Sequence, residues 1–311
     1  MGEALQALLG HINPYLLQII VNIGIGIVMA LGLNVITGLT GQLSLGHAAF
    51  MSIGAFTSAL ITIKLGLPFS INLIITGLVT AAAGALIGYP ILRLTGDYLA
   101  ICTLGFAEIV KVIFLNLEIT NKALGLSVPT PKTVIPMPIV VWLVVIISIV
   151  VVSFIHNSRF GRALKAIRGD EIAAEAMGIN LARYKVQSFA IGTFLAGVGG
   201  GLYAHFLSYI NPSDFGFLKS IDILSMIVLG GLGSIPGCVI GAAVLSAAPE
   251  FLRFMATYRM LVYGGLLVFM MIFRPNGLMG GINFTELVLR TIGRKPHMQQ
   301  FNKRDETNAD S

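Results

Sequence analysis

Long apolar stretches separated by short polar connections dominate the sequence. A helix needs roughly 20 mostly apolar residues to cross a bilayer. The pattern predicts spanning helices at about 16–37, 48–63, 70–92, 98–117, 139–155 and 186–209. Two shorter apolar pieces follow, at 221–228 and 239–252, and a last span at 259–273. We therefore predict an all-α, polytopic helical membrane protein with about eight to ten spans, including broken or re-entrant helices.

Residues 158–186 form the longest strongly polar interval between apolar blocks. They carry six of the 20 Lys and Arg residues. Because Lys and Arg in short loops are retained in the cytoplasm, we expect 157–185 to be cytoplasmic. Arg93 and the C-terminal tail are expected on the cytoplasmic side as well. The N-terminus and the proline-rich loop 118–138 are then expected outside.

A short helix is predicted inside this basic interval. Asp170 is a suitable N-cap, Glu171 suits the positive end of the helix dipole, and Gly178 fits the position just after the helix. A helix of about eight residues is marginal alone in water, so it needs a surface to lie against. Its narrow apolar stripe supplies one face for that contact: Ile172, Ala173, Ala176 and Ile179. The alternative is an ordinary solvated basic loop.

Two glycine-rich stretches, 33–55 and 227–242, interrupt the apolar pattern. Broken backbone at membrane depth is tolerated only where protein or a water-filled cavity shelters it. Paired interruptions in the two halves of a transporter point to its pathway. We take as candidate pathway residues Gln42, Ser44, Gly46, His47, Gly231, Ser234 and Gly237. The alternative is chance, because the chain has 36 glycines.

Glu108 and Lys111 are the main charged residues within an apolar span. They lie three residues apart, hence on one helical face. Charges inside a membrane are costly and usually neutralise each other. The pair is predicted to be an intramembrane ion pair, either structural or used for ion coupling.

Composition supports the membrane class. Apolar residues make up 56% of the chain and charged residues 11%, which a water-soluble fold of this length could not accommodate. The net charge of +6 is explained by cytoplasmic loops and anionic lipid headgroups, without nucleic acid. Cys102 and Cys238 suit neither a disulfide framework nor a metal site. The first residues lack a basic segment and a cleavage motif, so they are interpreted as mature chain.

Several of these blocks resemble one family. The run D-E-I-A-A-E-A-M-G-I-N, preceded by S-R-F-G-R-A-L-K-A-I-R, is similar to the cytoplasmic coupling segment of permease subunits of branched-chain amino acid ABC importers. The resemblance is greatest to the LivM-type subunit. It extends over about residues 33–280 and includes L-N-V-I-T-G-L-T-G-Q-L-S-L-G-H, G-D-Y-L-A-I-C-T-L-G-F-A-E-I and G-T-F-L-A-G-V-G-G-G-L-Y.

The resemblance implies a translocation role and a set of partners in the bacterial plasma membrane. It implies that the polar helix docks an ATPase through Gly169, Asp170, Glu171, Ala173, Ala174, Glu175 and Gly178. The partners would be a second permease of LivH type, two ATP-binding subunits and an extracytoplasmic substrate-binding protein, besides membrane lipids. The chain has no P-loop motif and no Gly-Lys dipeptide, so the ATPase is expected to be a separate chain.

The predicted domains are a transmembrane permease domain, 1–282, and a cytoplasmic tail, 283–311. We expect no catalytic residues, metal or cofactor in this chain. Its expected function is to form the pathway of an ATP-binding-cassette importer for amino acids, with leucine, isoleucine and valine implied by the resemblance. Related importers carry urea, amides or other amino acids, and these stay open. The alternative class is a self-contained secondary transporter or channel that uses Glu108 and Lys111.

Overall fold

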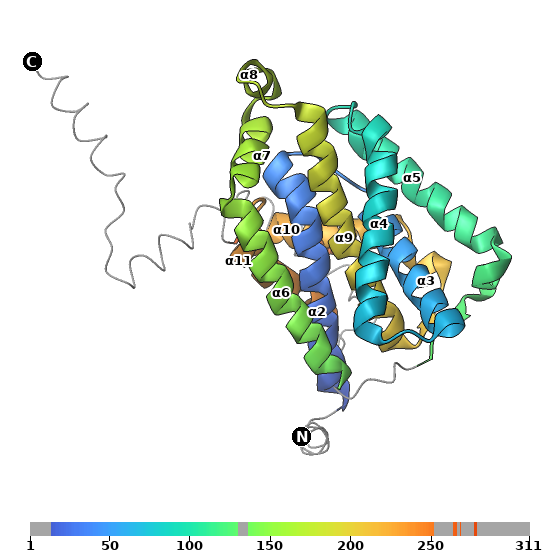
Figure 1. Cartoon of the computed structure of the whole chain (residues 1–311). Helices are drawn as coiled ribbons and strands as arrows, with labels where there is room; N and C mark the ends of the chain where they lie inside the picture. The colour runs from blue at the N-terminus through green and yellow to red at the C-terminus, as the bar shows by residue number, and fades with distance from the viewer. Residues whose placement is uncertain (1–13, 130–135, 252–263, 266–267, 269–276, 279–311) are drawn as a thin grey trace, which may run out of the picture.

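The structure is a computed structural model that describes residues 14–129, 136–251, 264–265, 268 and 277–278 (Figure 1). Its helices are α2 (Pro14–Leu33), the π-helix η1 (Asn34–Leu39), α3 (His47–Leu65), α4 (Phe69–Ile91), α5 (Asp97–Asn116), α6 (Met137–Asn157), α7 (Arg159–Gly169), α8 (Glu171–Ala176), α9 (Leu181–Leu207), α10 (Phe217–Gly230) and α11 (Ile235–Phe251). Short 3-10 turns occur at η2 (Glu118–Thr120), η3 (Lys122–Leu124) and η4 (Pro212–Phe215). The strands β1 (Leu126–Ser127) and β2 (Tyr209–Ile210) form one antiparallel pair.

The all-α membrane fold is confirmed. Within the described part of the chain, six helices are long and apolar enough to cross a membrane: α2 continued into η1, α3, α4, α5, α6 and α9. They match the six predicted stretches before residue 210. The two short apolar pieces are α10 and α11. The span expected at 259–273 falls almost entirely outside the described residues, and the tail 283–311 falls wholly outside them.

Helix α9 lies at the centre, where it packs against α2, α3 and α4 (Figure 1). Small residues allow this packing. A Cβ added to Gly200 would lie 2.1 Å from the Met51 carbonyl oxygen of α3. A Cβ on Gly84 of α4 would lie 2.2 Å from Thr193 Oγ1 of α9. Backbones brought this close gain dispersion contacts, which drive helix association where water is absent. Gly84 and Gly88 thus form a close-packing face of α4 against α9.

A network of polar side chains satisfies itself inside the α3–α4–α9 packing. Asn72 Nδ2 donates to the Ser58 carbonyl oxygen at 2.9 Å and to Thr62 Oγ1 at 2.8 Å. His205 Nε2 lies 2.8 Å from Thr62 Oγ1, and its Nδ1 lies 2.9 Å from the Gly201 carbonyl oxygen. These groups have the partners that buried polar atoms require.

Helices α10 and α11 form a hairpin of short helices that packs against α2. The two helices touch through glycine: a Cβ on Gly230 would lie 2.1 Å from the Gly237 carbonyl oxygen. Residues 277–278 close over the turn, since the Leu278 amide donates to the Leu229 carbonyl oxygen at 2.7 Å. The second glycine-rich stretch is therefore the bend of a hairpin.

Helices α7 and α8 lie at one end of the bundle, and the loop after α5 lies towards the other (Figure 1). Helix α6 runs towards the α7–α8 end and α9 runs back from it. The segments expected on opposite sides of the membrane thus lie at opposite ends. Which end faces the cytoplasm stays a prediction. Part of the loop 118–138, at 130–135, lies outside the described residues.

The glycine contact between α3 and α9 can be tested with Gly200→Ala. The added methyl group would meet backbone, which cannot swing aside as a side chain can, so the helices must separate. Overpacking of this kind costs about 1–3 kcal/mol. We expect a lower midpoint of thermal unfolding in detergent, followed by size-exclusion fluorescence. The matched control is Gly105→Ala on α5, where no heavy atom lies within 4 Å of the added Cβ. Equal midpoints for the two variants would contradict the packing described here.

Candidate coupling and translocation site

The predicted short helix is present as α8, with the predicted caps. Asp170 Oδ1 accepts hydrogen bonds from the amides of Ile172 at 2.8 Å and Ala173 at 3.1 Å. At the other end Gly178 has a φ of 84°. The Gly178 amide donates to the Glu175 carbonyl oxygen at 2.9 Å, and the Ile179 amide donates to that of Ala174 at 3.1 Å. This is the Schellman pattern, which favours glycine at its left-handed position.

The two faces of α8 differ sharply. Ala174 is buried against the chain itself, and Ile179 is half-buried. Ile172 on the opposite face and Met177 at the C-cap are 82% and 83% exposed. Of the predicted coupling residues, Gly169, Asp170, Ala173, Glu175 and Gly178 are exposed, whereas Ala174 packs inward. The exposed face therefore offers small and apolar side chains to a partner.

Glu171 is turned towards the chain rather than outward. Its Oε1 lies 2.6 Å from Lys185 Nζ on α9, and the Lys185 side chain is only 6% exposed. A buried ammonium without its partner would be strongly destabilising. The ion pair thus pins α8 to α9.

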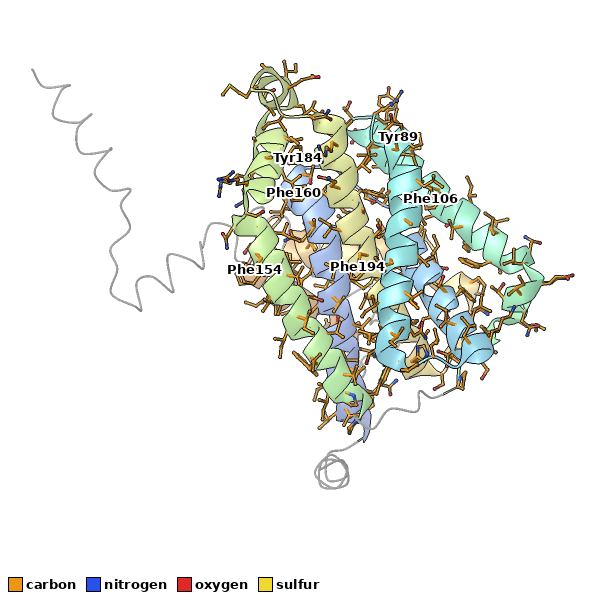
Figure 2. The ribbon with its side chains drawn as sticks, viewed as in Figure 1. Tyr89, Phe106, Phe154, Phe160, Tyr184 and Phe194 are labelled. Carbon is orange, nitrogen blue, oxygen red and sulfur yellow. The ribbon has the colours of Figure 1, made fainter. Side chains whose placement is uncertain are left out.

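Helix α7 was missed by the sequence analysis, which took most of 158–169 as polar connection. Ser158 Oγ caps it by accepting from the Gly161 amide at 3.1 Å. Leu164 and Ile167 are buried on one face. Phe160 stacks on Tyr184 of α9 with ring centroids 5.5 Å apart (Figure 2). The i, i+3 spacing of Leu164 and Ile167 among basic residues is the sequence pattern that could have predicted this helix.

Arg168, in the last turn of α7, bridges the two glycine-rich breaks. Its Nη1 donates to the carbonyl oxygen of Gly38 and, at 3.5 Å, to that of Leu232. The breaks also bind each other, because the Gly233 amide donates to Asn34 Oδ1 at 2.9 Å. We call these five residues (Asn34, Gly38, Arg168, Leu232 and Gly233) the break junction. The junction links the base of the coupling segment to both interrupted helices.

The first break runs irregularly from Gly41 to the start of α3. Gly41 has a φ of 77°. The Leu45 amide donates to Thr103 Oγ1 at 3.0 Å, and the Ala48 amide donates to Ser220 Oγ at 3.1 Å. A Cβ on Gly46 would lie 2.4 Å from the Thr103 carbonyl oxygen, so only glycine fits there. Backbone amides freed by the break are thus satisfied by α5 and α10.

Side chains at the same break are not satisfied. Gln42 and Ser44 are buried, and their side-chain polar atoms have no hydrogen-bond partner among the described residues. Ser52 Oγ and Asn34 Nδ2 share this condition, and His47 is fully buried close by. An unsatisfied buried polar group costs about 1–3 kcal/mol, which water or a passing polar solute would offset. The predicted pathway residues of the first break therefore gather at one place, and their role in transport stays a prediction.

The candidate residues of the second break shape its turn. Gly231 has a φ of 112°. Ser234 Oγ accepts from the Gly237 amide at 3.2 Å, in the first turn of α11. Gly237 forms the close contact with Gly230 described above. Contact of these three residues with a solute stays a prediction.

Glu108 and Lys111 form the predicted ion pair. Glu108 Oε2 and Lys111 Nζ lie 3.2 Å apart, with 41% and 27% of their side chains exposed. The two charges neutralise each other on a partly exposed face of α5. Neither the structural nor the ion-coupling interpretation is tested by this geometry.

The chain matches a family model described as "Branched-chain amino acid transport system / permease component" over residues 15–271. It belongs to this permease family. The permease is 40% identical over 285 residues to the high-affinity branched-chain amino acid transport system permease protein LivM of Salmonella typhimurium, covering 81% of this chain and 67% of that protein. LivM of Escherichia coli gives the same values. LivH of Salmonella typhimurium is 27% identical over 282 residues, covering 81% and 90%. No solved structure matches.

The break junction predicts that Arg168→Met uncouples the permease. Hydrogen bonds to charged groups contribute about 1.5–3 kcal/mol, so losing them should lower uptake about tenfold or more. Uptake and ATP hydrolysis should be measured together in the assembled transporter, and hydrolysis should persist. The matched control is Arg162→Met, because among the described residues Arg162 donates only to the nearby Asn157 carbonyl oxygen, at 3.1 Å. Normal uptake in Arg168→Met would show that the junction does not transmit motion.

Proposed function

We propose that this chain is the LivM-type permease subunit of an ATP-driven importer for branched-chain amino acids. It forms the translocation pathway together with a second permease of LivH type. Two separate ATPase subunits and an extracytoplasmic binding protein complete the transporter. Membership of the permease family supports the transport role, and the names of the LivM and LivH relatives support the substrate and the second permease.

The proposed partnership with an ATPase rests mainly on the capped and anchored structure of α8. A helix of six residues is too short to be stable alone, yet α8 is capped at both ends and held by the ion pair of Glu171 with the buried Lys185. Its outer face presents Ile172 and Met177 to solvent. Exposed apolar side chains on a rigid, small element suit docking into a groove on a partner. The P-loop that the sequence lacks would be supplied by that partner.

A physical connection leads from this helix to the interior. Helix α8 follows α7 directly, and Arg168 near the end of α7 binds both glycine-rich breaks. A displacement of α8 by an ATPase would thus pull on the break junction. The unsatisfied side chains at the first break lie on the path that would then open.

Reconstitution tests the proposal. Proteoliposomes with the second permease, the ATPase and the binding protein should accumulate leucine only with ATP inside, and removal of any one subunit should stop uptake. A self-contained secondary transporter would instead take up leucine without the ATPase, driven by an ion gradient. The substrate assignment would be wrong if the transporter took up another solute but not leucine, isoleucine or valine.

Docking on α8 is tested by Ala173→Arg. The long charged side chain would stand on the exposed face and keep the two surfaces apart. We expect copurification of the ATPase to fall at least about tenfold, since an unpaired charge in an interface costs several kcal/mol. The matched control is Ala123→Arg, an exposed alanine towards the opposite end of the bundle, which should retain the ATPase. Full retention by both variants would exclude α8 as the docking element.

A further inference from the structure

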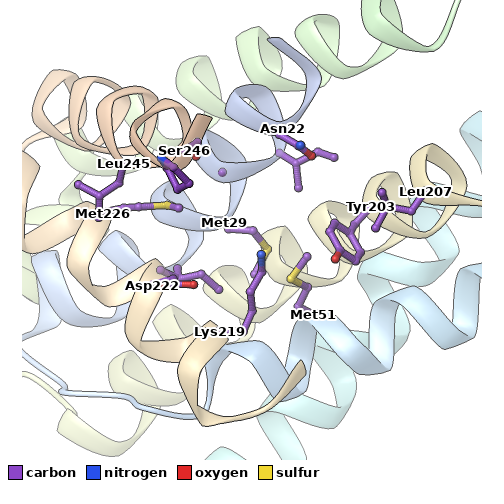
Figure 3. Close-up of a pocket in the computed structure, with 14 residues that line it drawn as sticks. Asn22, Met29, Met51, Tyr203, Leu207, Lys219, Asp222, Met226, Leu245 and Ser246 are labelled. Carbon is purple, nitrogen blue, oxygen red and sulfur yellow. The ribbon is translucent and has the colours of Figure 1, made fainter. Parts of the chain in front are cut away.

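A cavity of about 330 Å³ is lined by residues of α2, α3, α9, α10 and α11, and none of the break-junction residues is among them (Figure 3). Its volume is in the range of small-molecule sites. Its lining mixes apolar and charged side chains. Three methionines, Met29, Met51 and Met226, line it together with Lys219 and Asp222, and Lys219 lies next to Met29 and Met51 (Figure 3).

The two charged residues have opposite signs and lie on one face of α10. Both are half-buried. Lys219 Nζ lies over the Tyr203 ring, 5.4 Å from its centroid. No salt bridge joins Lys219 to Asp222, and neither charged group has a hydrogen bond with another described residue. The cavity therefore presents an ammonium and a carboxylate that attract each other yet keep their hydrogen-bonding capacity.

We propose that this cavity binds the substrate as a zwitterion: Lys219 takes the α-carboxylate of an apolar α-amino acid and Asp222 takes its α-ammonium group. The methionines receive the aliphatic side chain, since their flexible thioethers adapt to branched shapes. This assignment rests on the proposed function and adds a selective site within the permease itself. Asn22 and Ser246 contribute neutral polar groups to the same cavity.

Charge matching distinguishes among the substrates that the sequence left open. An α-amino acid brings one charge for each charged residue, and in a partly desolvated site both pairs are strengthened. Urea and neutral amides bring none, so both residues would lose hydration without compensation. The cavity therefore favours amino acids over urea and amides.

The position of the pair connects it to the glycine-rich breaks. Lys219 and Asp222 lie in the first half of α10, and α10 ends at Gly230 beside the break junction. Between them, Ser220 Oγ holds the Ala48 amide at the start of α3. Movement of either break would shift the two charges relative to Met29 and Met51. The same motion that opens the pathway would thus weaken the site and release the amino acid.

The test is equilibrium binding of radiolabelled leucine to the complete transporter without its binding protein, in lipid nanodiscs. Lys219→Met and Asp222→Asn should each weaken binding about tenfold or more, because each removes one charge-assisted contact. The matched control pair is Lys122→Met and Glu118→Gln, an exposed surface ion pair with a 3.2 Å separation, which should bind like the unaltered transporter.

Competition by leucine analogues separates a binding role from a loss of folding. Leucinamide lacks the carboxylate, so its affinity should change little in Lys219→Met. 4-Methylpentanoate lacks the ammonium group, so its affinity should change little in Asp222→Asn. Urea should not compete. The proposed site would be excluded if the unaltered transporter showed no saturable leucine binding. It would also be excluded if both variants lost affinity for leucine and both analogues to the same extent. If the unaltered transporter accumulates leucine with ATP in either case, the proposed function is retained and only the assignment of the binding site is wrong.

Discussion

An interrupted helix inside a membrane must find partners for its backbone amides and carbonyls within the protein, because lipid offers none. The placement of α5, α7 and α10 around the two breaks depends on how that requirement is met. Side chains from distant elements supply the partners: Thr103 from α5, Ser220 from α10 and Arg168 from α7. Each of these three bonds therefore also ties the first break to another helix. The breaks become the places where several helices are held together, and hence where a displacement of one reaches the others.

The end of the bundle that carries α8 is built for such a displacement. Helix α8 itself contacts the core through the Glu171–Lys185 ion pair and the inward packing of Ala174. Helix α7, to which it is joined, packs through the buried Leu164 and Ile167 and reaches the break junction through Arg168. A directional polar contact holds a short element such as α8 in one position, so α8 can transmit a force to α7 without a large interface of its own.

Hydropathy was sufficient to predict the spans, because membrane depth dictates their length and composition. Capping chemistry was sufficient for α8, because Asp170 and Gly178 act locally. The contacts that orient α8 could not be predicted: Glu171 faces inward because Lys185, a full helical turn into α9, is buried there. Helix α7 was not predicted, because its basic residues made the segment resemble a polar connection. Lys219 and Asp222 were missed because Lys219 precedes the apolar piece predicted at 221–228 and Asp222 is a single charge inside it. Only the hairpin of α10 and α11 brings them to a cavity.

Pairs of opposite charges within or beside the spanning helices differ in their geometry. Lys185 and Glu171 approach to 2.6 Å, and Lys111 and Glu108 approach to 3.2 Å, so each pair satisfies itself. Lys219 and Asp222 form no salt bridge although the same spacing along a helix permitted one for Glu108 and Lys111. Lys219 instead lies over the Tyr203 ring, and Asp222 faces the same cavity (Figure 3). Charges in a membrane protein are expensive, and a pair kept apart at a cavity gives up part of its mutual attraction. A ligand that carries both charges restores that attraction when it binds, and a solute without charged groups cannot do so.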